Sequence, residues 1–138
     1  MSLAEVDSFL DREFPQFRAL EGYRLEEIAP GRATMVLEAG ESHLRPGGTV
    51  SGPTLFTLAD VGAYAVLLAH VGPVPLIVTT SMTMNFMRRP PPGPLLALCT
   101  ILKLGKRLAV VEIGIRGASE ADLSAQATGT YSVPPGTG

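Results

Sequence analysis

The chain has 138 residues and a mass of 14.5 kDa, a size that fits one domain. Hydrophobic residues make up 46% and charged residues only 17%, which excludes a disordered chain and favours a second subunit over some apolar surface. The net charge of −2 leaves no basic stripe for nucleic acid.

The predicted elements, taken in chain order, begin with a short amphipathic helix within residues 1–15. Ser2 and Glu5 fit a capping box, and apolar residues recur after them at helical spacing. Six strand-like runs follow, two before a long apolar segment and four after it: 23–29, 34–38, 76–87, 95–104, 109–116 and 123–133.

The long apolar segment between the two groups of strands is the best-defined helix. Ser51 suits its N-cap, Pro53 its first turn, and Gly72-Pro73 its end. Apolar residues point in every direction around it, so we expect burial on all sides. The preceding residues 41–48 contain Pro46-Gly47-Gly48 and are predicted to form an irregular loop.

This order of elements predicts an α+β fold, in which an antiparallel sheet curls around a long central helix. Residues 1–138 form a single domain, with a frayed tail over 134–138. One curled sheet leaves a face or an edge in need of cover, which again favours dimerisation.

Cysteine and histidine are scarce enough to limit the possible chemistry. Cys99 is the single cysteine, which excludes an internal disulfide and a CxxC site, and a zinc site has little support from His43 and His70. The N-terminus carries acidic residues where a signal peptide carries basic ones, and residues 55–71 are interrupted and short for a membrane span. We expect a soluble cytoplasmic protein without a metal or a membrane partner.

Asp60 is the outlier of the long helix, because an isolated carboxylate there would be strongly desolvated. Thr54, Thr57, Asp60 and Tyr64 follow each other at spacings of three, three and four residues and share one helix face. This polar stripe would line a narrow wet site. Alternatively, Asp60 caps or hydrogen-bonds the backbone of a neighbouring loop across a subunit interface.

The start of the same helix is a second candidate site. Its first turn presents unpaired N–H groups that suit an oxyanion, and Gly52 allows close approach to the backbone. Arg45, in the preceding loop, is a candidate for the mouth of this site. The alternative is an ordinary helix cap after a glycine-rich turn.

Basic residues are few but grouped. Arg88 and Arg89 end one strand, and Lys103, Lys106 and Arg107 surround the next turn. They would contact a phosphorylated cofactor at the surface, or they are solvated loop charges.

Three segments together resemble the hotdog-fold acyl-CoA thioesterases of the PaaI type. They cover most of residues 40–132: GGTVSGPTLFTLADVGAYAV, VTTSMTMNFMRRPPPGPL and GKRLAVVEIGI. Those proteins carry His-Gly-Gly, six further residues and then Asp on the central helix.

The resemblance implies a role for several residues. Asp60 takes the place of the family's nucleophile or general base, and Gly52 that of its oxyanion N–H. Thr79 takes the place of a hydroxyl residue that helps hold the water. Three positions differ from the family pattern: Ser51 replaces its His, Pro53 its second Gly, and Arg45 an upstream Asn.

The resulting hypothesis is an acyl-CoA thioesterase that forms a homodimer or homotetramer and needs no cofactor beyond the CoA of its substrate. Asp60, Gly52 and Thr79 are the expected catalytic residues. The expected substrate and CoA contacts are Ser51, Arg45, Tyr64, Arg88, Arg89 and Lys106. The alternatives are a hotdog protein that binds acyl-CoA without hydrolysis, a hydratase or dehydratase of the same fold, and a purely structural oligomer.

The spacing of Gly52 and Asp60 predicts that two chains build one site. Eight residues of helix separate their backbones by about 12 Å. A general base acts within about 3 Å of the proton it removes, directly or through one water. Two antiparallel helices at a dimer axis would instead place Gly52 of one chain beside Asp60 of the other.

Overall fold

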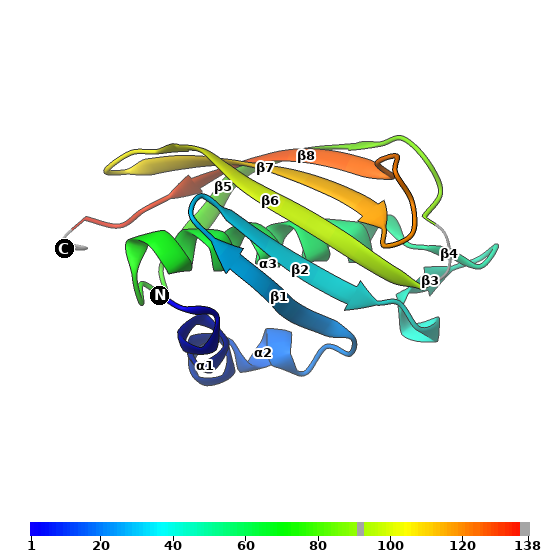
Figure 1. Ribbon diagram of the computed structural model, residues 1–138, viewed down its shortest axis with the longest axis horizontal. Coiled ribbons are helices and arrows are strands. Elements are labelled where there is room, and N and C mark those ends of the chain that lie inside the picture. The colour runs from blue at the N-terminus through cyan, green and yellow to red at the C-terminus, as the bar shows by residue number, and fades with distance from the viewer. Residues whose placement is uncertain (91–92, 136–138) are drawn as a thin grey trace.

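The computed structural model describes residues 1–90 and 93–135, so the last three residues of the predicted tail lie outside the described residues. Figure 1 labels its elements. The helical elements are α1 (Leu3–Glu13), α2 (Pro15–Arg18), the 3₁₀ turn η1 (Glu41–His43) and α3 (Gly52–Val71). The strands are β1 (Tyr23–Ala29), β2 (Arg32–Glu38), β3 (Leu44–Arg45), β4 (Thr49–Val50), β5 (Val78–Phe86), β6 (Pro94–Leu104), β7 (Leu108–Gly117) and β8 (Ala125–Ser132).

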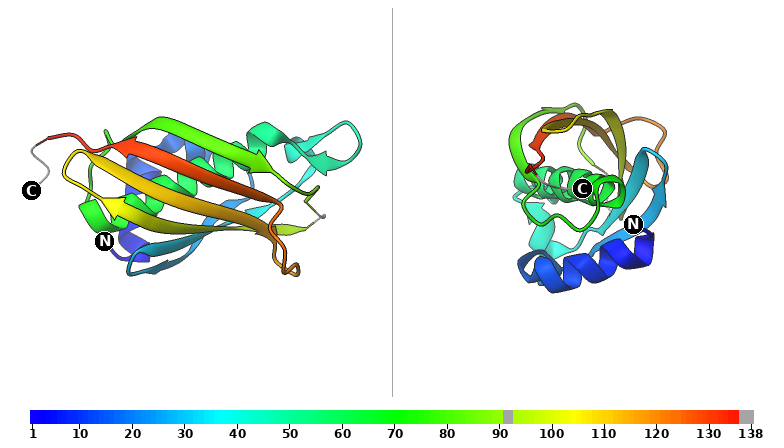
Figure 2. Two further views of the ribbon diagram at one scale, coloured as in Figure 1. Left: turned by 90° about the horizontal axis from the view of Figure 1, so that it is seen from above. Right: turned by 90° about the vertical axis from the view of Figure 1, so that its left-hand side faces the viewer.

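Six strands form one antiparallel sheet in the order β1-β2-β6-β7-β8-β5. The sheet curls around α3, and α1 lies across the open side below the helix (Figure 2). The predicted α+β architecture is therefore confirmed, with β1 and β5 as the two edges of the sheet.

Both predicted helix starts are confirmed at atomic detail. At α1, Ser2 Oγ accepts the Glu5 N–H at 3.2 Å while the Glu5 carboxylate accepts the Ser2 N–H at 2.9 Å. At α3, Ser51 Oγ accepts the Thr54 N–H at 3.3 Å. The helix ends before Gly72, whose φ of 109° few other residues adopt.

The prediction of an irregular loop over 41–48 was wrong. After η1 the chain forms a small hairpin, in which Leu44 pairs with Val50 and Arg45 with Thr49. Gly47 and Gly48 have φ values of 99° and 77°, and this left-handed backbone closes the turn. The hairpin delivers the chain to the start of α3 and fixes Arg45 near it.

Helix α3 packs tightly into the sheet because one of its residues has no side chain. A Cβ added at Gly62 would lie 2.7 Å from Cys99 Sγ and 3.4 Å from Met35 Cβ. By length and composition alone α3 is apolar enough to cross a membrane, but here it is the buried core helix of a soluble fold.

Strand β5 carries an extra residue opposite β8. Thr79 pairs with Tyr131 and Ser81 with Thr130, so Thr80 forms a β-bulge between them. Bulges change which side chains point inward along a strand. Strict alternation back from the half-buried Met82 would put Thr80 on the inner face, whereas the bulge puts Thr79 there.

We expect the protein to lose stability at alkaline pH. Burial raises the pKa of the Cys99 thiol to about 12, and burial together with the nearby Asp60 charge raises the pKa of the Tyr131 phenol. Both groups are thus protonated in the folded state at a pH where the unfolded chain has released the protons. Their stabilisation is complete below the unfolded pKa values and declines above about pH 9, by up to about 1.4 kcal/mol per pH unit for each group.

Urea unfolding between about pH 8 and pH 11 measures this slope. Cys99→Ala should make the free energy of unfolding nearly independent of pH up to about pH 10, where the unfolded phenol begins to ionise. An equal slope in both proteins below that pH would contradict the assignment to Cys99.

Candidate active site

The carboxylate of Asp60 is held at one oxygen by two neutral donors. Thr79 Oγ1 donates to Asp60 Oδ1 at 2.7 Å, and the Tyr131 hydroxyl donates to the same oxygen at 2.8 Å. Among the described residues no donor contacts Oδ2, and no Lys or Arg forms an ion pair with Asp60. Oδ1 is therefore fixed, whereas the lone pairs of Oδ2 accept no hydrogen bond from the described residues. No cationic side chain among them pairs with the carboxylate.

The two donors come from neighbouring strands. Thr79 on β5 and Tyr131 on β8 are directly opposite each other in the antiparallel ladder, and the bulge at Thr80 gives Thr79 its inward orientation. Within the chain, the hydrogen-bond partners of the Asp60 carboxylate are side chains of the sheet. The alternative considered for Asp60, a contact with a loop backbone across a subunit interface, stays a prediction.

Tyr131 is the residue of this group that was not predicted from sequence. It is 1% exposed, and burial raises the pKa of its phenol, so the hydroxyl remains a donor at ordinary pH. A signal was present: the other inward positions of β8 carry only Ala125, Ala127 and Gly129. A single large polar side chain on such a strand indicates a specific partner.

Asp60 opens into a cavity of about 400 Å³, which we call the Asp60 pocket. It lies between the α1–α2 segment on one side and β5 on the other, beside the middle of α3. Its walls are mainly apolar, with Asp60, Thr79 and Tyr131 as a polar group. The lining residues are Glu13, Phe14, Gln16, Asp60, Val61, Tyr64, Pro75, Ile77, Val78, Thr79 and Tyr131.

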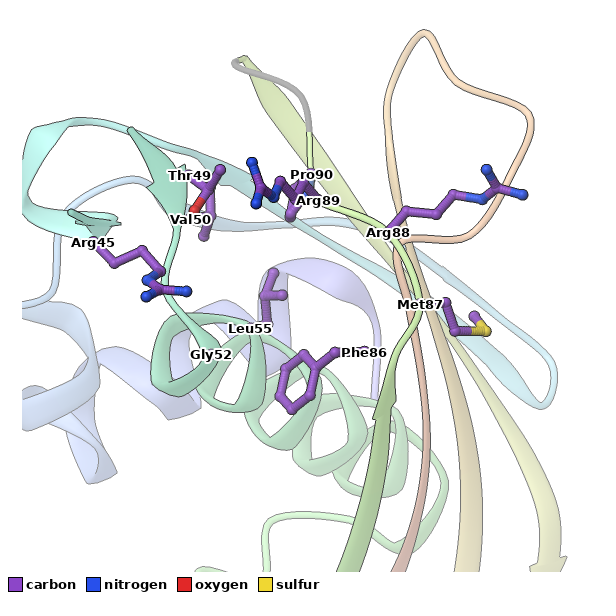
Figure 3. A pocket seen from close by; sticks show the side chains of 10 residues that line it. All are labelled: Arg45, Thr49, Val50, Gly52, Leu55, Phe86, Met87, Arg88, Arg89 and Pro90. Atoms are coloured by element: carbon purple, nitrogen blue, oxygen red, sulfur yellow. The ribbon is translucent and has the colours of Figure 1, made fainter. Parts of the chain in front are cut away.

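A separate cavity of about 430 Å³ lies over the first turn of α3, and we call it the Gly52 pocket (Figure 3). It is lined by Arg45, Thr49, Val50, Gly52, Leu55, Phe86, Met87, Arg88, Arg89 and Pro90. The Phe86 ring covers the backbone here, since a Cβ added at Gly52 would lie 3.6 Å from it. The residues of the two pockets do not overlap.

One backbone N–H of this turn is free to bind a ligand. Pro53 has no N–H, the Thr54 N–H donates to Ser51 Oγ, and the Leu55 N–H donates to the Ser51 carbonyl at 3.1 Å. In the part of the chain that the structure describes, the Gly52 N–H has no acceptor. It lies at the positive end of the α3 dipole, where an oxyanion is stabilised.

The arginines around the Gly52 pocket are not equivalent. Arg45 reaches toward the first turn of α3, and Arg89 lies beside Thr49, whereas Arg88 points away from Gly52 (Figure 3). Arg88 Nη2 lies 3.8 Å from an Asp122 carboxylate oxygen, an exposed contact of little energetic weight. Arg45 and Arg89 are therefore the better placed cations.

The structure does not bring Lys106 to the arginines within one chain. Lys106 lies in the β6–β7 turn, at the opposite end of the molecule from Arg88 and Arg89 (Figure 1). It lines a different cavity with His70 and Arg107, at the C-terminal end of α3.

The spacing of the polar residues along α3 predicted that they line one wet site. This prediction was wrong. Asp60 and Tyr64 line the Asp60 pocket, where the Tyr64 hydroxyl donates to the Pro75 carbonyl at 3.0 Å. Thr54 and Thr57 line a different cavity. The Thr57 hydroxyl donates to the Pro53 carbonyl at 3.0 Å, and the Thr54 hydroxyl bonds Ser51 Oγ at 2.7 Å. Both hydroxyls are thus engaged within the first turns of α3, and Ser51 has a capping role.

Comparison with known proteins identifies the family of this fold and site. The family model described as "Thioesterase superfamily" matches residues 47–123, more than half of the chain and including both Gly52 and Asp60. The chain belongs to the thioesterase superfamily. Membership confirms the resemblance to hotdog-fold enzymes of the PaaI type and makes the protein a thioester hydrolase.

Individual members of the thioesterase superfamily align over nearly the whole chain. A crystal structure of a "putative thioesterase" from Silicibacter sp. TM1040 is 42% identical with a TM-score of 0.88, covering 98% of this chain and 93% of that one. The phenylacetic acid degradation protein PaaI from Thermus thermophilus, in a mutant structure, is 28% identical with a TM-score of 0.75. That match covers 87% of this chain and 99% of the other. A "putative esterase" of Pseudomonas aeruginosa is 30% identical over 97% of this chain and 99% of its own.

Proposed function

We propose that this thioesterase hydrolyses acyl-CoA thioesters, with Asp60 as its catalytic carboxylate. The observation that carries the proposal is the geometry of Asp60: Oδ1 is fixed by Thr79 and Tyr131, and Oδ2, without a donor among the described residues, lies beside a partly apolar cavity. A carboxylate so arranged has one oxygen for chemistry and one for positioning. The cavity offers space for an acyl group.

Two chemical routes are open to this carboxylate. As a general base, Asp60 accepts a proton from water while the water oxygen attacks the thioester carbonyl. The C–S bond of the resulting tetrahedral intermediate then breaks, and the proton passes to the leaving CoA thiolate. As a nucleophile, Asp60 forms a mixed anhydride with release of CoA, and water then hydrolyses the anhydride. In either route the Gly52 N–H would stabilise the oxyanion.

We propose that the active protein is a homodimer or a dimer of dimers. Asp60 and Gly52 line separate pockets, as expected from a separation of about 12 Å along α3. Strand β5 is an edge strand and, with its flanking residues, exposes several large apolar side chains: Leu76, Val78, Phe86 and Met87. An apolar edge of this kind is suited to pairing with a second chain, which would bring the partner's Gly52 pocket to Asp60.

The proposal needs no metal and no cofactor other than the CoA of the substrate. It places the enzyme in the cytoplasm, where CoA thioesters are formed and used. Lys106 remains a candidate CoA contact only across a subunit interface, because within one chain it is remote from the arginines.

We expect the arginines of the Gly52 pocket to contribute to acyl-CoA binding rather than to the chemical step. Arg89→Gln and the Arg88→Gln, Arg89→Gln double variant should raise KM for an acyl-CoA with kcat mostly unchanged, since phosphate contacts are made equally in the ground and transition states. Arg88→Gln alone serves as the comparison, with a smaller effect expected because the Arg88 side chain points away from Gly52. Steady-state kinetics are measured with acyl-CoA and with an acyl pantetheine that lacks the nucleotide phosphates. The comparison distinguishes contacts to these phosphates from contacts to the rest of the substrate. A collapse of kcat with KM unchanged would contradict a phosphate role.

The function itself is tested by release of free CoA thiol from a panel of aryl, short-chain and medium-chain acyl-CoAs. The protein itself should give no background signal with the thiol reagent. Its only thiol, Cys99, is 1% exposed and burial raises its pKa, so it does not react in the folded state. Release above the rate without enzyme supports the proposal. Binding of several acyl-CoAs without release would instead favour an acyl-CoA-binding protein, and addition of water to an unsaturated acyl group would favour a hydratase.

A further inference from the structure

We infer that Tyr131 is a positioning residue for the catalytic carboxylate: it fixes Asp60 Oδ1 so that Oδ2 alone faces the reacting carbonyl. This inference rests on the proposed function of Asp60. It goes further by assigning separate tasks to the two oxygens and by naming a residue on β8 that sets them.

The contact geometry is specific to one oxygen. The Tyr131 hydroxyl lies 2.8 Å from Asp60 Oδ1 and 3.3 Å from the Asp60 carbonyl oxygen, so it bridges the side chain and the backbone of the same residue. Thr79 contributes a second donor to Oδ1 at 2.7 Å. With two donors on Oδ1, rotation of the carboxylate to present that oxygen to substrate would break both hydrogen bonds.

The fold makes room for the Tyr131 ring with a glycine. A Cβ added at Gly129, two residues before it on the same face of β8, would lie 2.8 Å from Tyr131 Cε1 and 3.0 Å from Met82 Cε. A side chain at this position would have to displace the ring. Gly129 therefore leaves space for the ring in the place from which its hydroxyl reaches Asp60.

The donor is permanent, and this separates it from a catalytic acid or base. The phenol is buried and lies beside an anionic carboxylate, which keeps it protonated. A group that does not titrate in the working range cannot remove a proton from water. Its contribution is to the orientation of the carboxylate.

Steady-state kinetics of Tyr131→Phe test the inference. We expect kcat to fall about 10- to 100-fold, as for other small misplacements of a reacting group, with KM changed less than about twofold. Gly129→Ala should lower kcat in the same way by displacing the ring.

Two matched controls make the same substitutions, Tyr to Phe and Gly to Ala, at positions away from Asp60. Tyr23→Phe deletes the hydroxyl of another half-buried tyrosine that lines neither the Asp60 pocket nor the Gly52 pocket. Gly114→Ala introduces a similar close contact, 3.0 Å from Leu123 Cδ2, away from Asp60. Both should keep the wild-type kcat and KM.

The Tyr131 hydroxyl proton provides a readout that needs no Tyr131 variant. Buried and hydrogen-bonded, it should give a slowly exchanging NMR resonance in the wild type, which shifts in Asp60→Asn. A resonance unaffected by Asp60→Asn would overturn the inference.

The kinetic outcomes separate the two claims. Loss of activity in Asp60→Asn together with an unchanged kcat in Tyr131→Phe would overturn the positioning role and leave the proposed function standing. Activity retained in Asp60→Asn would overturn both.

Discussion

Replacement of Asp60 by Asn should lower kcat by about 10²- to 10⁴-fold, the range associated with loss of a general base. Asn keeps the size of the side chain and an acceptor oxygen, so Thr79 and Tyr131 still have a hydrogen-bond partner and the fold should be retained. What is lost is the anionic oxygen. KM should change little, because most of the acyl-CoA is bound by other residues.

The control for this variant is Asp11→Asn, which removes an exposed carboxylate on α1 that pairs with Arg18 and lines neither pocket. It should leave kcat unchanged. Thermal unfolding of both variants checks that they are folded. Turnover close to wild type in folded Asp60→Asn would defeat the assignment of Asp60 as the catalytic carboxylate.

The second large effect is a gain of activity when two inactive variants are mixed. Asp60→Asn lacks the carboxylate and Gly52→Pro lacks the backbone N–H, so each homodimer should be inactive. If Asp60 of one chain acts with Gly52 of the other, exchange of subunits produces a heterodimer with one intact site and one site that lacks both groups. Thiol release should therefore return on mixing.

The structure supplies a control for the Gly52 variant. A Cβ at this position meets Phe86 at 3.6 Å, an ordinary contact, so Gly52→Ala fits while keeping the N–H and should retain activity. Subunit exchange is verified with differently tagged chains. Continued inactivity after verified exchange would rule out a shared site, because a site within one chain cannot be restored in this way.

The fold could be predicted from sequence because its main elements are specified by residues close together in the chain. The capping pattern at Ser2, the apolar circumference of α3 and the glycine after it each specify an element without long-range information. Asp60 could also be predicted from sequence as a functional residue, because burial of a carboxylate in an apolar helix is costly unless it has a specific partner or task. These features depend on spacing along the chain, which the sequence contains directly.

Other features of the site depend on contacts between distant segments. The hydrogen bond from Tyr131 to Asp60 joins residues 71 positions apart, and no local pattern specifies it. The separation of Lys106 from Arg88 has a local cause instead, because the 11 residues of β6 lie between them and carry the chain from one end of the sheet to the other. Clustering of basic residues along the chain was therefore a poor guide to clustering in space.

The bulge in β5 has a consequence for how the site can be dissected. Two threonines, Thr79 and Thr80, stand side by side where the strand carries its extra residue, and only one faces Asp60. A bulge displaced by one residue would put Thr80 in the place of Thr79, leaving the pairing from Ser81 onward intact. The chain thus holds a second hydroxyl next to that of Thr79, now donating to the Thr130 carbonyl at 3.1 Å, that a displaced bulge would bring to Asp60. Replacement of both threonines together therefore isolates the contribution of a hydroxyl donor from β5.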